Sequence, residues 1–169
     1  MTRRPDEALE LLPATGRLSE SFGIFNPAFL PWRSLAAYAL HELGEDSQAL
    51  DLSTAELALA RRFRARRPLG VALRAQGLLV GGEDGLALLR ESTEVLSGSG
   101  ASLERAHAFV PLGAALRRAG RRAEAREPLA QGFELAERCG ATPLAKLARE
   151  ELGAGGARPR AEGRGPMGR

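Results

Sequence analysis

Several residue types are scarce in this sequence of 169 residues, and each scarcity excludes a class of protein. Aromatic residues make up 5% of the chain, and Cys139 is the only cysteine, so an internal disulfide is excluded. No apolar run approaches the roughly 18 residues that a membrane-spanning helix needs. The first residues soon turn acidic and lack the apolar core of a signal peptide. We therefore expect a soluble, cytoplasmic protein.

Lysine is almost absent, since Lys146 is the only lysine among 24 basic residues. A phosphate-binding loop needs a glycine-rich turn followed by a lysine and a hydroxyl, and no glycine loop precedes Lys146. His41, His107 and Cys139 have no partners at metal-ligand spacing. No serine or cysteine stands with a histidine and a carboxylate in a recognisable nucleophilic pattern. We expect no enzymatic activity, no catalytic residues, no cofactor and no metal.

The abundant residues are alanine and leucine, within a hydrophobic content of 44%. Alanine lets helix backbones approach and leucine fills the seam between them, so the composition favours closely packed helices. The net charge of +3 is concentrated in residues 153–169, which contain four arginines and one glutamate. Because the remainder is close to neutral, the basic pI is weak evidence for a nucleic-acid-binding protein.

Four columns of residues recur at an interval of 38 residues. The first column contains glycine, and the second contains leucine four residues earlier. A small residue stands seven residues before each glycine, and an alanine stands five residues after it. In this order the columns are Gly44, Gly82 and Gly120; Leu40, Leu78 and Leu116; Ala37, Ala75 and Gly113; and Ala49, Ala87 and Ala125.

Each copy of the repeat is typical of a helix, a tight turn and a second helix. The glycine fits a left-handed helix end, and the small residues facing alanines would let the two helices cross closely. We predict an all-α, right-handed solenoid of antiparallel helix pairs with a period of about 38 residues. Residues 1–152 form the array and residues 153–169 a disordered Gly/Arg-rich tail. Within the array we expect a half-pair at 5–21, pairs at 31–67, 69–97 and 102–138, and a last helix at 143–152.

This period and turn pattern resemble the tetratricopeptide repeat. Four segments also resemble the repeat region of large, ATP-binding LuxR-type transcriptional regulators of actinobacteria, related in layout to the maltose regulator. These are "NPAFLPWRSLAAYAL", "GVALRAQGLL", "LERAHAFVPLGAALRRAGRRAEAREPL" and "LAERCGATPLAKLAREELGAGGARPR". The resemblance covers about residues 5 to 160. The sequence departs from the family pattern at Pro111, and at Arg64 and Arg66, where small or turn residues are usual.

The resemblance implies a regulatory repeat segment that lacks its nucleotidase and helix-turn-helix domains, and hence a fragment of such a regulator. The segment would sense an effector or a protein partner and relay binding to DNA-binding activity. A free-standing tetratricopeptide adaptor is an alternative. We expect neither membrane binding nor direct DNA binding by this chain.

First helices of such pairs line a concave groove. We predict that it contains Ser34, Tyr38, His41, Gln76, Arg117 and Arg118, which could hold a peptide or small effector with an acidic group. The alternative is an ordinary solvent-exposed face.

A second candidate surface is the cluster Arg61, Arg62, Arg64, Arg66 and Arg67, which could contact phosphates in a non-specific nucleic-acid binder. Only Phe63 interleaves with these charges, and no recognition helix is evident. The alternative is the polar end of a long second helix, where cations suit the helix C-terminus.

The N-terminal end of the array is predicted to be apolar. Leu9, Leu11 and Leu12 would lack the helix against which they pack in a complete pair, so self-association is expected. Trp32 is interpreted as a packing anchor at the start of a helix, beside Pro31.

Overall fold

The computed structural model describes residues 5–156, and these residues form eight helices and no strand. The chain is therefore all-α over this range, as predicted. No helix among these residues is long and apolar enough to cross a membrane. The helices are α1 (Pro5–Ser21), α2 (Trp32–Glu42), α3 (Asp46–Phe63), α4 (Arg66–Val80), α5 (Gly82–Ser97), α6 (Ser102–Arg118), α7 (Arg122–Arg138) and α8 (Thr142–Gly156).

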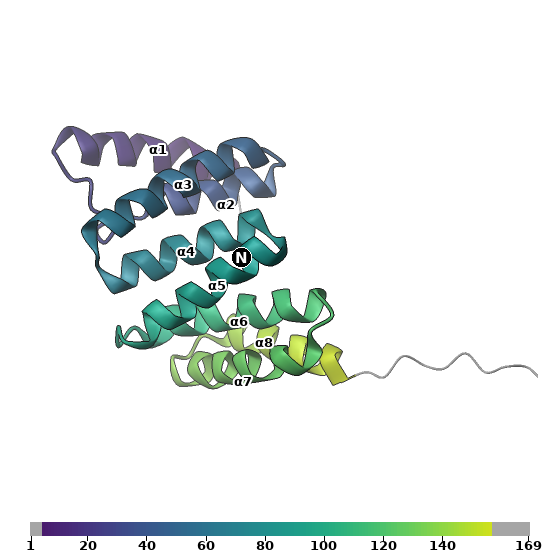
Figure 1. Cartoon of the computed structure of the whole chain (residues 1–169). Coiled ribbons are helices and arrows are strands. Elements are labelled where there is room, and N and C mark those ends of the chain that lie inside the picture. The colour runs from purple at the N-terminus through teal and green to yellow at the C-terminus, as the bar shows by residue number, and fades with distance from the viewer. Residues whose placement is uncertain (1–4, 157–169) are drawn as a thin grey trace, which may run out of the picture.

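The helices are stacked in chain order from α1 at one end to α7 and α8 at the other (Figure 1). Each helix packs against the next one in the sequence, and α2, α4, α6 and α8 also pack against one another in turn. Within the described residues, the backbones of α1, α3, α5 and α7 do not approach one another, and side chains bridge some of them through ion pairs such as Arg61 with Glu91 and Arg90 with Glu124. The even-numbered helices therefore form a continuous inner row, and the odd-numbered helices form an outer row.

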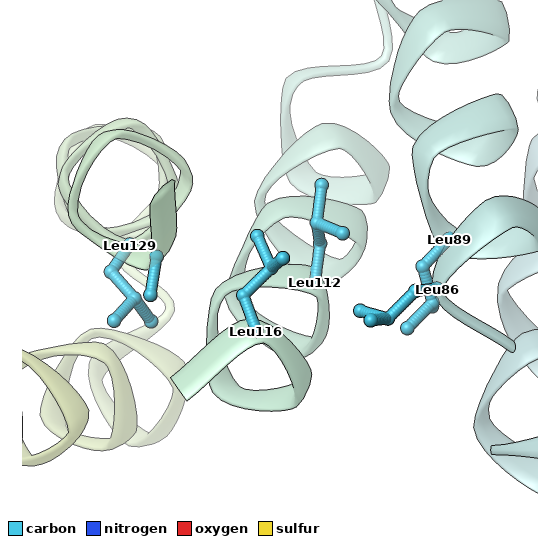
Figure 2. Packing of buried hydrophobic residues seen from close by; sticks show 6 residues of the cluster. Leu86, Leu89, Leu112, Leu116 and Leu129 are labelled. Atoms are coloured by element: carbon cyan, nitrogen blue, oxygen red, sulfur yellow. The ribbon is translucent and has the colours of Figure 1, made fainter. Parts of the chain in front are cut away.

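Leucines fill the space between successive pairs. Figure 2 shows Leu112 and Leu116 of α6 lying between Leu129 of α7 and the leucines of α5, Leu86 and Leu89. All five are buried, and their burial away from water provides the main stabilisation of the stack.

The three repeated glycines all adopt positive φ, at 83° for Gly44, 58° for Gly82 and 78° for Gly120. Gly44 and Gly120 follow a helix end as predicted, whereas Gly82 is the first residue of α5 and Gly81, with φ of 65°, follows the end of α4. At the first and third turns the leucine column completes the helix end. The backbone N–H of Glu45 donates to the Leu40 carbonyl at 2.9 Å, and that of Arg121 donates to the Leu116 carbonyl at 2.9 Å. These bonds satisfy carbonyls that the helix end would otherwise leave free.

Close crossing of the two helices occurs in all three pairs, but the middle pair uses different residues. Ala37, Ala49 and Ala125 are buried as predicted, and a Cβ at Gly113 would overlap Leu129. The prediction for Ala87 is wrong, because this residue is exposed. Only Gly81 separates α4 from α5, whereas three residues separate the helices of the other pairs. The shorter turn moves the crossing to Gly77 and Gly85, where a Cβ on Gly85 would lie 2.5 Å from the Gly77 carbonyl oxygen.

Three predicted boundaries are also corrected. The second helix of the first pair ends at Phe63 rather than 67, and α4 begins at Arg66 rather than 69. Arg64 causes the break, since it adopts a left-handed conformation with φ of 55° and its N–H bonds the Ala60 carbonyl. The last helix continues beyond 152 to Gly156, so the start of the predicted tail is helical. The remaining tail, 157–169, lies outside the described residues, as do residues 1–4.

Candidate functional site: a hollow on the inner row

A hollow of about 600 Å³ lies where α2, α4 and α6 meet beside the first turns of α1. Helices distant in the sequence therefore contribute to one surface, which the continuous inner row makes possible. We call it the inner hollow. It is lined by Pro5, Ala8, Leu35, Tyr38, Ala39, His41, Glu42, Arg74, Leu78, His107 and Pro111.

The walls of the inner hollow are largely apolar. Leu35 and Ala39 come from α2, Leu78 from α4 and Pro111 from α6. The side chain of Leu35 is exposed, which is unusual for a leucine next to a core. This lining suits the apolar part of a ligand or the side chains of a peptide.

Two charged side chains line the inner hollow, Arg74 of α4 and Glu42 of α2. Arg74 also takes part in a shared ion pair outside the lining: Arg74 Nη1 lies 3.2 Å from Glu104 Oε2, and Arg67 Nη2 lies 3.1 Å from Glu104 Oε1. Two guanidinium groups thus share the carboxylate of Glu104, so Arg74 keeps capacity to attract an anionic group.

His107 lies one helical turn after Glu104 and faces the same hollow. Burial and the neighbouring charge of Arg74 lower its pKa below the ordinary value, and Glu104 opposes this effect. The imidazole is therefore neutral near pH 7 and can donate or accept one hydrogen bond.

Tyr38 and His41 complete the polar lining from α2. The hydroxyl of Tyr38 is buried and has no hydrogen-bond partner within the described residues, so it is available to form a hydrogen bond with a ligand. His41 Nδ1 lies 2.6 Å from Asp46 Oδ1 at the start of α3. His41 is thus held at the rim of the inner hollow by the neighbouring helix.

The structure places only two of the predicted groove residues, Tyr38 and His41, in the inner hollow. The placement of Ser34 on an outward face is wrong, because this residue is 1% exposed. Gln76 instead donates to Thr54 Oγ1 of α3 at 3.0 Å. Arg117 pairs with Glu151 of α8. Arg118 lines a separate hollow of about 420 Å³ near the α4–α5 turn.

Arg74 and His107 were not predicted from the sequence, because the residues that line the inner hollow do not recur at the 38-residue interval. Arg74 follows Tyr38 by 36 residues, and Pro111 follows Arg74 by 37. The sequence does contain a local pattern that could have indicated these residues. In two places a polar residue and an apolar residue are four positions apart and so share a helical face: Arg74 with Leu78, and His107 with Pro111.

The arginine cluster is divided between two helices. Arg61 and Arg62 end α3, as the alternative interpretation expects, whereas Arg66 and Arg67 begin α4. Arg61 pairs with Glu91 at 3.5 Å and Arg67 with Glu104. Residues 5–156 also carry 20 acidic and 18 basic side chains. The cluster therefore lies on a body with a slight excess of negative charge.

A buried carboxylate, which the sequence did not reveal, joins the first three helices. Glu56 of α3 is 1% exposed, and burial raises its pKa to about 7, against the lowering effect of Arg33. Arg33 Nη1 lies 3.5 Å from Glu56 Oε2, and Arg33 also pairs with Glu20 of α1. The same guanidinium lies 4.6 Å from the centre of the Trp32 ring.

Trp32 is a packing anchor, as predicted, because a Cβ at Gly16 of α1 would overlap its indole ring. It begins α2, and Pro31 is the residue before the helix rather than its first member. Trp32 and Arg33 together fix α1 against α2.

Among residues 5–156, no group of three or more His, Cys, Asp or Glu side chains is arranged to hold a metal ion. No protein-family model matches the chain, and no curated protein is significantly similar to it.

Proposed function

We propose that this chain is a cytoplasmic, non-catalytic binding module of tetratricopeptide-like, right-handed solenoid architecture. Two features support the architecture: the 38-residue columns and the inner row in which α2, α4, α6 and α8 contact in turn. Contacts restricted to neighbouring units are the hallmark of helical solenoids.

The observation that carries the binding function is the inner hollow. It combines apolar walls, the guanidinium group of Arg74, which shares the carboxylate of Glu104 with Arg67, and His107, whose pKa is lowered. This combination favours a ligand with an apolar body and a carboxylate: a small effector or an acidic peptide.

A titration of the ¹⁵N-labelled chain with 3-phenylpropanoate tests this function. We expect the largest amide shifts around Tyr38, Arg74 and His107, with affinity at least about tenfold weaker for the neutral amide of the same compound. Arg74→Gln should remove the preference for the acid, and Arg118→Gln should keep it. Shifts that are scattered over the surface, or equal affinities for acid and amide, would contradict the proposal.

We further propose that the module is the regulatory repeat segment of a LuxR-type regulator, relaying binding to attached nucleotidase and DNA-binding domains. The four sequence segments that resemble that family support this assignment. The genomic DNA on both sides of the reading frame tests it. A nucleotidase upstream and a helix-turn-helix downstream would support it, whereas unrelated neighbours would favour a free-standing adaptor.

Non-specific nucleic-acid binding through Arg61–Arg67 is less well supported. Two of the five arginines are paired with glutamates, and the described body has no basic excess. Steeply salt-dependent binding to duplex DNA that is lost on neutralising Arg62, Arg64 and Arg66 would revive it.

A further inference from the structure

The outer face of α1 exposes two leucines, with Glu7 at its N-terminal end, and no other helix of residues 5–156 packs on it. Leu11 and Leu18 lie seven residues apart, which places them on one helical face, and the exposed Phe22 follows in the turn after α1. Leu11 is 67% exposed and Leu18 is 59% exposed. We call these residues, with Ala14 between the two leucines, the outer face of α1.

The opposite face of α1 is already in use. Leu9 packs against the buried cluster of Ala37, Leu40 and Ala49, and Gly16 receives the ring of Trp32. A surface helix usually needs only one apolar stripe, so a second stripe indicates a second partner.

Further exposed aromatic residues follow α1 in the chain. Phe25 and Phe29 are exposed, and they line a small hollow together with Ser19 of α1 and Trp32. Because Trp32 packs against Gly16 on the opposite face of α1, this hollow is not part of the outer face.

Two exposed charges identify the partner. Glu10 and Arg17 border the outer face of α1 on the same edge, one near each half of the helix. If a second α1 crosses antiparallel about a two-fold axis near Ala14, Glu10 of each copy faces Arg17 of the other. A parallel two-fold arrangement would place this edge of the two copies on opposite sides of the contact, so Glu10 and Arg17 would not pair between copies. The small side chain of Ala14 allows close approach at the axis.

We propose that two copies of this chain form a closed dimer through the outer faces of α1, antiparallel about a two-fold axis. The inference does not depend on the function proposed for the inner hollow. A two-fold contact covers the apolar face of both copies at once. Head-to-tail stacking would instead place the outer face of α1 on α8, where the charged residues Lys146, Arg149 and Glu150 surround a single exposed leucine, Leu147.

Sedimentation velocity of the full chain from about 1 to about 300 µM tests the dimer, and Leu18→Asp should raise its dissociation constant at least about 30-fold. Leu147→Asp is the matched control, since this leucine is exposed at the other end, on α8. It should leave the dimer unchanged. Both positions are exposed, and circular dichroism verifies that each variant is folded.

Charge reversal tests the geometry. Glu10→Arg and Arg17→Glu should each weaken the dimer by about three- to tenfold, and the double reversal should restore wild-type affinity. Single reversals without effect would overturn the antiparallel arrangement. A chain that stays monomeric throughout, forms species larger than a dimer, or is dissociated by Leu147→Asp would overturn the proposal as a whole.

Discussion

The two ends of the helical stack differ in what they present to solvent. At the first end, α1 exposes Leu11 and Leu18 on its outer face, and the exposed Phe22 follows in the next turn. At the last end, α8 exposes Lys146, Arg149 and Glu150 around one leucine, Leu147, with Lys146 Nζ 3.8 Å from Glu150 Oε1. Arrays of helical pairs need a polar outer face where they stop. By this criterion the exposed face of α8 is closer to that of an end helix than the outer face of α1 is.

The ends also differ in how they are attached to the body. A buried cluster of Trp32, Arg33 and Glu56 joins α1 to α2 and α3. At the other end, exposed pairs such as Arg149 with Glu137, 3.8 Å apart, join α8 to α7. Because its charges are buried, the packing of α1 against α2 and α3 should be sensitive to pH and to small changes in side-chain size. The charges that join α8 to α7 are exposed, so changes there should have little effect on stability.

The largest expected effect is the pH dependence caused by Glu56. Its pKa of about 7 in the folded chain lies above the ordinary value of 4.5, so the folded state binds the proton more tightly than the unfolded state. The free energy of unfolding should therefore fall as pH rises from about 4.5 to about 7, by at most about 3 kcal/mol, and stay level above that.

Urea unfolding of wild type and Glu56→Gln at pH 4, 6 and 8 measures this effect. The two proteins should be similar at about pH 4, and the variant should be the more stable one near pH 8. A variant that is less stable near pH 8 would show that the Arg33 contact outweighs the cost of burying the carboxylate.

Replacing a glycine by alanine should change the free energy of unfolding in opposite directions in α1 and in α8. Gly16→Ala places a Cβ inside the ring of Trp32, so we expect a loss of about 2 kcal/mol in the free energy of unfolding. Gly153→Ala meets nothing within 4 Å and improves helix propensity, so we expect a gain of up to about 1 kcal/mol. Denaturant titration of both variants compares them, and equal effects at the two ends would contradict the proposed difference in attachment.

The smallest effect is expected from the exposed pair on α8. Lys146→Gln should change the free energy of unfolding by less than about 0.5 kcal/mol, because solvent screens this ion pair. The same titration in low and high salt measures it. A larger loss would mean that exposed charges secure α8 more firmly than their distances suggest.

The sequence predicted the features that a local conformational rule determines. Gly44, Gly82 and Gly120 adopt positive φ because a tight turn after a helix requires it, whatever surrounds them. The exposed position of Ala87 was not predicted, since it depends on a turn two residues shorter than its equivalents. Periodicity alone does not report loop length.

The candidate site was predicted less well for a different reason. Tyr38 and His41 were found because the first helix of the first pair fixes the register, but Arg74 and His107 belong to a surface that three helices form together. The pairing of Arg33 with Glu56 likewise joins residues 23 positions apart on separate helices. Such contacts follow from packing angles, which a repeat pattern does not specify.

The restriction of contacts to near neighbours has a kinetic consequence. Because no helix of the described range packs far along the chain, contact order is low, and chains with mainly local contacts fold quickly. Local unfolding can also begin at the helices of one end while the helices at the other end stay folded, as in a one-dimensional array of repeats. The rate of amide hydrogen exchange should then fall from the terminal helices toward α4, α5 and α6, so the inner hollow is bordered by α1 and α2, which open early, and by α4 and α6, which open late.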